Sequence, residues 1–299
     1  MRYDLTTLEI FVAVAEEANL TRAAERQHLA VSAVSKRITE LEELAEAPLL
    51  ERLPRGVALT PAGQSLLHYA RQMLQLVERM KSELSEYAGG VKGHIRIHAS
   101  TSALTQFVPR ELESFLNLYP MIRIEIEERV GAAIVRAVAD GTTDIGILGS
   151  HTPTQGLPAI PYHFDHLVLA VPSGHPLARR KQVRFADALA FPFVAHHPSS
   201  SLWTLMTEAA RAAGKPLESR IQVSSFECMC QLVQANFGIA LLPEGVLGNR
   251  LPSSAMRVVQ LKDAWALRQL VIVVRDLDTL PFTTRTLIDH LRTAAARAA

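Results

Sequence analysis

The sequence predicts an α/β protein with an N-terminal winged helix-turn-helix, a long linker helix and a C-terminal two-lobed α/β domain. Three observations support this fold class. Residues 20–44 hold two short helical patterns joined by a tight turn. A longer helical pattern follows, with an apolar seam at heptad spacing between residues 66 and 87. Beyond Gly93, short apolar runs alternate with helical patterns, as they do in βαβ units.

The composition is that of an ordinary globular protein, with 48% hydrophobic and 20% charged residues in a chain of 299. This length predicts two or three domains. No run of about 18 apolar residues is present and the N-terminus has no basic leader, so we expect a cytoplasmic protein without membrane contact. The two cysteines, Cys228 and Cys230, are too few and too close for a disulfide framework or a four-ligand zinc site, and we expect them to be reduced.

The first helix is expected at about residues 5–18. Its apolar face holds Leu8, Phe11, Val12 and Ala15. We interpret this face as scaffold core, which Leu20 and Leu29 should help to close.

The two helices within residues 20–44 have the spacing of a helix-turn-helix. In the second helix the apolar side holds Val34, Ile38 and Leu41, and the opposite side holds Ser32, Ser35, Lys36 and Thr39. Thr21 is expected to cap the first helix, and the small Ala23 and Ala24 allow the helices to cross closely. One face can therefore pack while the other enters a groove of DNA.

Residues 53–60 predict a two-stranded wing that turns at Arg55-Gly56. Arg52 and Arg55 would then reach phosphate or the minor groove; the alternative is a pair of solvated arginines. Local charge alone does not favour DNA, because residues 1–63 hold seven Lys and Arg against ten Asp and Glu. The cations that lie in the second helix and the wing are Lys36, Arg37, Arg52 and Arg55. So few cations predict a modest salt dependence of binding.

The linker helix is expected to begin after Thr60, a natural N-cap, with Pro61 in its first turn, and to end at Ala88-Gly89-Gly90. Its apolar positions repeat with a 4-3 spacing, at Leu66, Ala70, Met73, Val77, Met80, Leu84 and Tyr87. This seam predicts a coiled-coil pair and hence a homodimer. The alternative is a helix that lies on its own domain.

The C-terminal part predicts two α/β lobes. Strands are expected around residues 95–99, 122–126, 144–148, 166–171, 192–195, 221–223, 239–242 and 271–274, with helices between them, one of which runs from Leu104 to Leu116. The repeated βαβ order predicts a parallel sheet with helices on both faces. Two strands that cross between the lobes would leave a cleft at the carboxyl ends of the strands, where ligands of such sheets bind.

Two hydroxyl-rich segments lie between a strand end and a helix start, one in each lobe. They are Ser100, Thr101 and Ser102 in the first lobe, and Ser199, Ser200 and Ser201 in the second. Hydroxyls and unpaired backbone N–H groups at such positions favour a carboxylate or another small anion, and ordinary N-capping is the alternative. Glu128 and Gly149, at the ends of two further strands, are weaker candidates for the wall of the cleft.

The sequence supports no catalytic or metal constellation. It has no GxSxG elbow, HExxH motif, phosphate-binding glycine loop or GxGxxG after a strand, so we expect no enzymatic activity, metal or cofactor. The adjacent His196 and His197 point in different directions on extended chain, which disfavours a shared metal but allows one of them to donate to a ligand. His163 and His166 fall in a strand and are expected to be structural, and Asp144 should cap or bond the backbone.

Residues 5–63 resemble the winged helix-turn-helix of the LysR-type transcriptional regulators, through LEIFVAVAEEANLTRAAERQHLAVSAVSKRITELE and PLLERLPRGVALTPAG. The C-terminal half is similar to the effector domain of that family, itself akin to the type 2 periplasmic solute-binding fold, through HIRIHASTSALTQFVPRELESF, ADGTTDIGIL, LVLAVPSGHPLA and NFGIALLPEGV. Where the family usually begins its recognition helix with Ser-Gln, this chain has Ala30-Val31, which leaves the base preference there open. Glu46 and Leu50 replace a usual Gly and Phe and suggest a modified helix end.

The resemblance implies a sequence-specific activator or repressor that binds double-stranded DNA, is controlled by a small anionic effector, forms a homodimer or homotetramer and contacts RNA polymerase. The implied DNA contacts are Thr21, Ser32, Ser35, Lys36, Arg37, Arg52 and Arg55, and the hydroxyl-rich segments would hold the effector. The implied domains are residues 1–62 for DNA binding, 63–90 for dimerisation and 91–299 for effector binding. The last divides into lobe I, about 91–166 and 268–299, and lobe II, about 167–267.

Three other classes of protein match parts of the pattern. A solute-binding protein of a transport system is disfavoured by the missing export signal and the added N-terminal helices. An enzyme on the same two-lobed fold would need a charged catalytic group or a cofactor lysine in the cleft, and none stands out. A protein-interaction adaptor that uses the winged domain without DNA is compatible with the acidic local charge.

Overall fold

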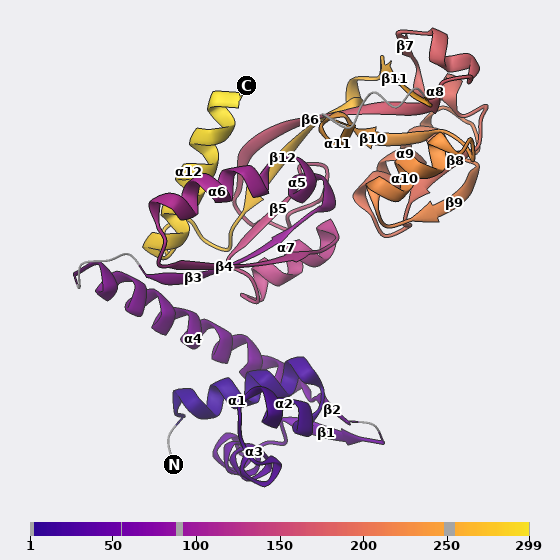
Figure 1. Cartoon of the computed structure of the whole chain (residues 1–299). Coiled ribbons are helices and arrows are strands. Elements are labelled where there is room, and N and C mark those ends of the chain that lie inside the picture. The colour runs from indigo at the N-terminus through magenta and orange to yellow at the C-terminus, as the bar shows by residue number, and fades with distance from the viewer. Residues whose placement is uncertain (1–2, 55, 88–91, 248–254, 299) are drawn as a thin grey trace. The chain divides into compact units, whose positions relative to one another are not determined.

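The computed structural model describes residues 3–54, 56–87, 92–247 and 255–298, and it divides into two compact units. The first unit is Met1–Gly93 with Asp140–Thr142, and the second is His94–Ala139 with Thr143–Ala299. Figure 1 labels the elements of both units. Within the described residues, no helix combines the length and the apolar character needed to cross a membrane.

Three helices open the first unit: α1 (Leu5–Glu17), α2 (Leu20–Arg26) and α3 (Val31–Ala45). Asp4 caps α1 by accepting a hydrogen bond from the Thr7 amide at 2.9 Å. Asn19 caps α2, because its Oδ1 accepts from the amides of Thr21 and Arg22 at 2.8 and 3.1 Å. The prediction that Thr21 caps this helix is therefore wrong: the helix begins earlier, and Thr21 lies inside its first turn.

The core of the first unit draws on all three helices, but the predicted face of α1 is only partly correct, because Leu8 and Phe11 are buried whereas Val12 and Ala15 are half-buried. Its buried residues include Ile10, Phe11, Val14, Ala23, Ala24, Val34, Ile38 and Leu41. Leu20 packs at the edge of this core, but Leu29 is 40% exposed, which corrects the prediction that it closes the core. The turn before α3 passes through His28 in the left-handed conformation, with φ 53°, and Leu29 follows it on the surface.

The wing is an antiparallel pair of strands, β1 (Leu50–Leu53) and β2 (Gly56–Leu59), with Arg52 opposite Val57. Gly56 has φ +100°, and a Cβ there would lie 2.3 Å from the carbonyl oxygen of Ala18 at the end of α1. Both facts require glycine at this position. Arg55 lies outside the described residues.

The base of the wing is attached to α3. Oε1 of Glu42 accepts hydrogen bonds from the amides of Leu49 and Leu50 at 2.8 and 3.1 Å. Before the wing, α3 ends at Glu46, which has the left-handed conformation with φ 51°. The helix α3 and the base of the wing are thus held together by hydrogen bonds from backbone amides to the Glu42 side chain.

The linker helix α4 (Pro61–Tyr87) begins as predicted. The hydroxyl of Thr60 accepts from the Gly63 amide at 3.0 Å and donates to the Pro48 carbonyl at 2.6 Å. This satisfies an otherwise unpaired amide of the first turn. Ala88-Gly89-Gly90, where the helix was expected to end, lie outside the described residues, as does the side chain of Tyr87.

The apolar seam of α4 divides into two parts. Leu66 packs against the core of the first unit and Ala70 is fully buried, so this part of the helix lies on its own domain. Farther along, Met73, Met80 and Leu84 are 45%, 51% and 58% exposed. This second part presents an uncovered apolar surface, as a coiled-coil partner requires.

The second unit is built on a mixed sheet with the strand order β4-β3-β5-β12-β6-β11-β7, and β10 also pairs with β6. Lobe I contributes β3 (Gly93–Ala99), β4 (Ile122–Glu128) and β5 (Ile145–Gly149), with the helices α5 (Thr101–Gln106), α6 (Val108–Leu118), α7 (Gly131–Ala139) and α12 (Phe282–Ala298). β3 and β5 are parallel as predicted, but β12 runs antiparallel to both β5 and β6. The expected parallel sheet is therefore mixed, because one connecting strand leaves lobe I and the other returns to it.

The helix expected from Leu104 to Leu116 is two helices. α5 ends and α6 begins at Phe107, whose φ of −122° and ψ of −56° are not helical. Pro109 lies in the first turn of α6, where its missing N–H costs nothing, whereas in a continuous helix the carbonyl of Thr105 would lose its donor.

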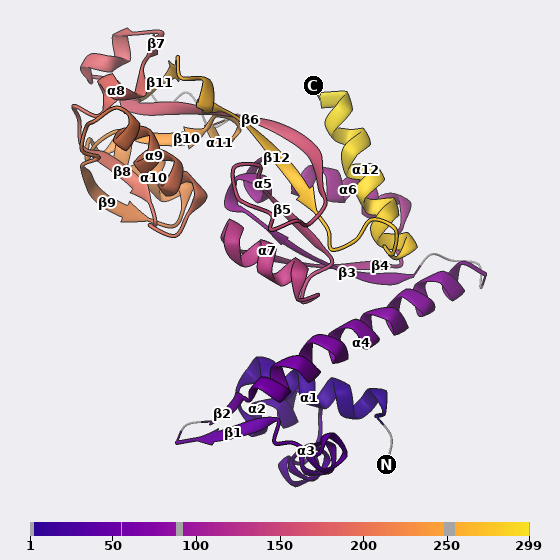
Figure 2. The same cartoon turned by 180° about the vertical axis from the view of Figure 1, so that it is seen from behind.

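Lobe II contains β7 (Gln182–Val183), α8 (Phe185–Ala188), β8 (Phe193–His196), α9 (Ser201–Ala212), β9 (Ser219–Val223), α10 (Phe226–Gln234), β10 (Ala240–Pro243), α11 (Glu244–Leu247) and β11 (Met256–Leu261). Two strands join the lobes, β6 (Ala159–Pro172) and β12 (Leu267–Val273). The first half of β6 pairs with β12, and its second half pairs with β10 and β11. Figures 1 and 2 show β6 and β12 side by side on the path between the lobes.

Candidate functional site

A narrow cleft brings the two predicted hydroxyl-rich segments together. Its lining residues are Ser100, Thr101, Ser102, Arg129, Val130, Gly131, His196, His197, Ser200, Ser201, Leu202 and Phe226. They come from the starts of α5, α7, α9 and α10 and from the end of β8. The free volume is about 20 Å³, close to the space that one water molecule needs.

On the lobe I side, the three hydroxyls have different partners. Ser100 caps α5 without a side-chain hydrogen bond, and its buried Oγ has no partner. The Oγ of Ser102 accepts from Nη2 of Arg268 at 3.2 Å, so its own proton is free to donate. The hydroxyl of Thr101 donates to Glu128 instead. Ser100 and Ser102 therefore have protons available to a ligand, whereas that of Thr101 is engaged.

On the lobe II side, Ser200 is the N-cap of α9, since its Oγ accepts from the Trp203 amide at 3.1 Å. Ser201 follows as the first residue of the helix. The Oγ of Ser199 lies 2.8 Å from Nδ1 of His197, and Ser199 does not line the cleft. The ordinary capping expected as an alternative thus accounts for Ser200, and the cleft receives mainly the backbone N–H groups of this helix start.

The two weaker candidates for the wall do not line the cleft. Glu128 lies behind Thr101 and accepts its proton. Gly149 faces His151, and a Cβ on Gly149 would lie 2.5 Å from Cε1 of that ring. Burial lowers the pKa of His151, and the positive charge of Arg268 lowers it further.

His196 is the most enclosed polar side chain of the cleft, at 1% exposure. Burial lowers its pKa to about 4; the neighbouring His197 acts in the same direction, and the Ser224 carbonyl acts against both. That carbonyl lies nearby, but neither ring nitrogen makes a hydrogen bond of acceptable geometry. His196 is therefore neutral near pH 7.

Beneath the cleft lies a buried ion pair. Arg268 of β12 and Asp165 of β6 are partners in the strand register, and Nη2 of Arg268 donates to Oδ2 of Asp165. Gln106 of α5 donates to the other carboxylate oxygen at 3.2 Å and accepts from the Gly245 amide at 3.1 Å. The pair and Gln106 thus connect lobe I, both crossing strands and the start of α11.

The outward side of α3 carries the predicted polar residues. Ser32 is exposed, and the side chain of Lys36 is 78% exposed and 3.8 Å from Glu40. Thr39 donates its hydroxyl proton to the Ser35 carbonyl at 3.1 Å. Val31, the first residue of the helix, is 42% exposed.

Arg37 has a different position from the one expected of a base-reading side chain. Its Nη1 donates to Oγ1 of Thr7 at 2.8 Å and lies 3.7 Å from Oδ1 of Asp4. The guanidinium is therefore partly engaged with the N-terminus of α1. Arg52 of β1 is exposed, as a phosphate contact requires.

Several acidic residues of the first unit have partners inside it. Glu16 pairs with Arg26 at 2.9 Å and with Arg71 of α4 at 3.2 Å. Glu17 pairs with Arg22 at 3.7 Å, and Glu42 holds the wing. These acids have local partners inside the first unit, but the pairs also occupy Arg22 and Arg26, so the acidic excess of residues 1–63 remains.

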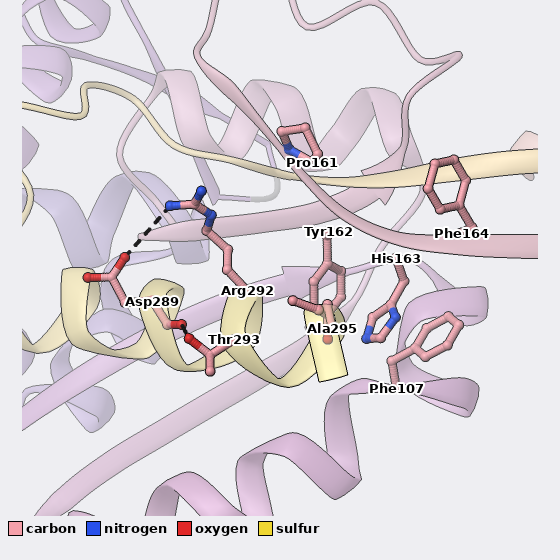
Figure 3. Close-up of a pocket in the computed structure, with 10 residues that line it drawn as sticks. Phe107, Pro161, Tyr162, His163, Phe164, Asp289, Arg292, Thr293 and Ala295 are labelled. Atoms are coloured by element: carbon pink, nitrogen blue, oxygen red, sulfur yellow. Dashed lines mark hydrogen bonds and ion pairs between the residues drawn. The ribbon is translucent and has the colours of Figure 1, made fainter. Parts of the chain in front are cut away.

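A second cavity, of about 870 Å³, lies in lobe I between β6 and α12 (Figure 3). In Figure 3, Tyr162 and His163 lie together beside Phe107 and α12. Glu111 of α6 accepts from the Tyr162 hydroxyl and lies 2.6 Å from Nε2 of His163, whose ring stacks on Phe107 at 4.0 Å. Burial and Glu111 raise the pKa of Tyr162. His163 is thus structural, as predicted, and the described lining of this cavity leaves no buried side-chain N or O atom unpaired.

Other predicted assignments have clear outcomes. Asp144 binds the backbone, since its Oδ2 accepts from the Arg96 amide at 2.8 Å. His166 is half exposed and lies 3.7 Å from Glu244. Cys228 and Cys230 on α10 are not joined by a disulfide. Within the described ranges, no group of three or more His, Cys, Asp or Glu side chains is arranged to hold a metal ion.

Two family models match the chain. Residues 88–296 match the LysR substrate binding domain, and residues 5–64 match the bacterial regulatory helix-turn-helix protein of the lysR family. The chain belongs to the LysR family. It is a DNA-binding transcriptional regulator with a C-terminal effector-binding domain.

Individual LysR-type relatives and solved structures support this assignment. The HTH-type transcriptional regulator CysL of Bacillus subtilis is 28% identical over 270 residues, which cover 90% of each chain. A full-length OxyR variant from Pseudomonas aeruginosa has the same fold, with a TM-score of 0.78, 19% identity and coverage of 99% of this chain and 95% of that one. The CcmR regulatory domain of Synechocystis, solved with 2-PG, has a TM-score of 0.62 at 19% identity and covers 68% of this chain and 98% of that one.

Sequence reasoning missed Arg268, Asp165 and the cleft-lining Arg129 of this LysR-type effector domain, and it left the role of His196 open. Arg268 and Asp165 each stand in an apolar strand segment, which is an available signal of a buried pair. Their pairing could not be read from the sequence because it depends on the register of β6 and β12. His196 was considered only for a metal or as a donor, and its unpaired nitrogens become visible only in three dimensions.

Proposed function

We propose that this regulator binds a small anionic effector in the cleft between its lobes and that α3 and the wing read its operator. The observation that carries the effector site is the set of buried polar atoms without partners. Ser100 Oγ and both ring nitrogens of His196 are such atoms, and both residues line this cleft. Leaving a buried polar group without a hydrogen bond costs about 1–3 kcal/mol, so binding of a ligand that hydrogen-bonds to these groups is favoured.

The charge of the cleft supports an anion. Among the described residues that line it, Arg129 is the charged one, and no carboxylate is present. Oε2 of Glu127 lies 2.6 Å from Nη2 of Arg129 and partly neutralises its positive charge. The first N–H groups of α9, which has 12 residues, add positive potential on the opposite side.

The DNA contacts we propose are Thr21, Ser32, Ser35, Lys36, Arg37, Arg52 and Arg55. Lys36 and Ser32 are the strongest of these, because both are exposed on the outward side of α3. Arg37 would contribute the part of its positive charge that Asp4 does not neutralise. The fold shared with CcmR, which was solved with a small molecule, supports ligand control by the C-terminal domain.

We further propose a homodimer through the exposed part of α4, assembly of two dimers into a tetramer, contact with RNA polymerase and a cytoplasmic location. The uncovered Met73, Met80 and Leu84 support the dimer. In the proposed mechanism the effector changes the closure of the lobes, which changes how subunits pack and hence how they bend or space the DNA.

The experiment that tests the DNA part is a nuclease footprint on DNA flanking the gene for this protein. Wild type is compared with the double variant Ser32→Ala, Lys36→Ala and with Lys181→Ala, which removes an exposed cation of lobe II. We expect a roughly two-fold symmetric protected site that the double variant loses and Lys181→Ala keeps. No protection at low salt, where phosphate contacts are strongest, would overturn this site and favour the adaptor.

A further inference from the structure

His196 is held by packing while its polar atoms stay unpaired. It ends β8 and shares the cleft with Ser100 and Ser102. Its ring packs against the rings of His197 and Phe226, with centroids 4.4 and 5.1 Å apart. Neither ring nitrogen makes a hydrogen bond of acceptable geometry, although the Ser224 carbonyl lies near the ring. The arrangement presents a fixed imidazole to whatever enters the cleft.

A neutral imidazole has one N–H donor and one lone-pair acceptor. The low pKa of His196 keeps the ring in this form at physiological pH. An anionic oxygen can accept a hydrogen bond from the N–H of the ring. It is repelled by the lone pair of the other ring nitrogen. The lone pair therefore needs a ligand group that carries a proton.

The other polar groups of the cleft are well suited to an anion but leave this lone pair unfilled. Ser102 has its oxygen occupied by Arg268, so it offers a proton. Ser100 offers a second hydroxyl, and the start of α9 offers backbone N–H groups. A carboxylate can satisfy these donors. It has no proton near pH 7 with which to satisfy the acceptor nitrogen of His196.

We propose that His196 selects the effector, and that the effector is a small hydroxycarboxylate whose hydroxyl pairs with the imidazole while its carboxylate lies among the serines and the α9 amides. This inference rests on the cleft being the effector site, as proposed above. A hydroxyl both donates and accepts, so it matches either tautomer of the ring. An amine would also donate, but it would bring a positive charge to a cleft whose described lining has Arg129 and no carboxylate. The free volume of about 20 Å³ is smaller than such a hydroxycarboxylate, so binding requires the lobes to move apart, as the proposed mechanism allows.

The test is isothermal titration of the full-length protein with acids that differ by one hydroxyl. The pairs are glycolate and acetate, lactate and propionate, and malate and succinate, with glycine as the amine counterpart of glycolate. In at least one pair we expect the hydroxy acid to bind about tenfold more tightly, which corresponds to one hydrogen bond to a buried group. Glycine should bind more weakly than glycolate. Equal affinity within all three pairs would overturn the proposal.

Variants assign the discrimination to His196. His196→Phe keeps an aromatic ring against Phe226 but removes both nitrogens. The ratio between the affinities of the hydroxy acid and its partner acid should therefore fall to about one. His196→Gln keeps one donor and one acceptor and should retain part of the ratio. His166→Gln, at an exposed position outside the cleft, should behave as wild type. Circular dichroism checks that each variant is folded. An unchanged ratio in His196→Phe would remove His196 from the reading of the hydroxyl.

Ser100→Ala separates failure of this inference from failure of the cleft as a site. If both members of a pair bind equally and Ser100→Ala weakens both, the cleft stands as the effector site and the role of His196 is wrong. If no acid binds, or if binding does not respond to Ser100→Ala, the cleft itself fails and this inference fails with it.

Discussion

Arg268 of β12 and Asp165 of β6 form an ion pair that is almost completely buried, with exposures of 5% and 1%. Because Nη2 of Arg268 also donates to Ser102, the pair joins the cleft proposed to hold the effector to both strands that connect the lobes. Gln106 extends this contact to the Gly245 amide in lobe II. A ligand that moves Ser102 would therefore act directly on the joint between the lobes.

Removing one partner of this pair should destabilise the effector domain. Asp165→Leu leaves the charge of Arg268 buried and uncompensated, which is expected to cost about 3–5 kcal/mol. The double change Asp165→Leu, Arg268→Leu should recover much of this loss, because no lone charge remains. Urea unfolding followed by tryptophan fluorescence is specific for this domain, since Trp203 and Trp265 both belong to it. A single variant as stable as wild type would mean that water reaches Arg268.

Stability of the effector domain should fall as the pH drops from about 6.5 towards 4. Burial lowers the pKa values of His196, His98 and His151. In this window the unfolded chain binds protons that the folded chain does not, so stability rises with pH, and His196 contributes at most about 1.4 kcal/mol per pH unit. Urea unfolding at pH 7 and pH 5 should show a smaller loss for His196→Gln than for wild type. Equal losses would show that His196 is protonated in the folded state or does not titrate in this range.

Val31 should contribute to base preference through an apolar contact. It is exposed at the first position of α3, where its methyl groups can meet the methyl group of a thymine in the major groove. Replacing one such thymine by deoxyuridine in one of the two protected half-sites should weaken binding by about fourfold, the value of one buried methyl group. The measurement is a footprint titration on each substituted site. In Val31→Ala the same replacement should have little effect, and an undiminished effect would point to another residue.

The exposed part of the α4 seam should hold the dimer together. The double variant Met80→Glu, Leu84→Glu places charges on that surface and should give a monomer in light scattering coupled to gel filtration. Gln72→Glu adds a negative charge at an exposed position off the seam and serves as the matched control. A dimer that persists in the double variant would show that α4 is not the main contact between subunits.

The parts of the fold that sequence reasoning predicted are those that depend on local patterns. The stripe of Val34 and Ile38 follows from helical periodicity, and the positions of Ser100 and Ser201 follow from a strand end and a helix start. What it missed depends on distant partners. The direction of β12 is set by its return from lobe II, and Leu29 is exposed because a left-handed turn precedes it. The unpaired state of His196 likewise depends on which groups the fold leaves around it.

The bond between Glu42 and the base of the wing has a consequence for how operators can diverge. Since α3 and the wing are held together, the proposed major-groove contact of α3 and the proposed wing contact within one half-site would keep a constant separation. A change in the distance between half-sites has to be followed by α4 and by the association of subunits. If α3 reads the operator and α4 pairs the subunits as proposed, base preference and half-site spacing can evolve independently, the first by substitution on the outward side of α3 and the second by changes along the seam of α4.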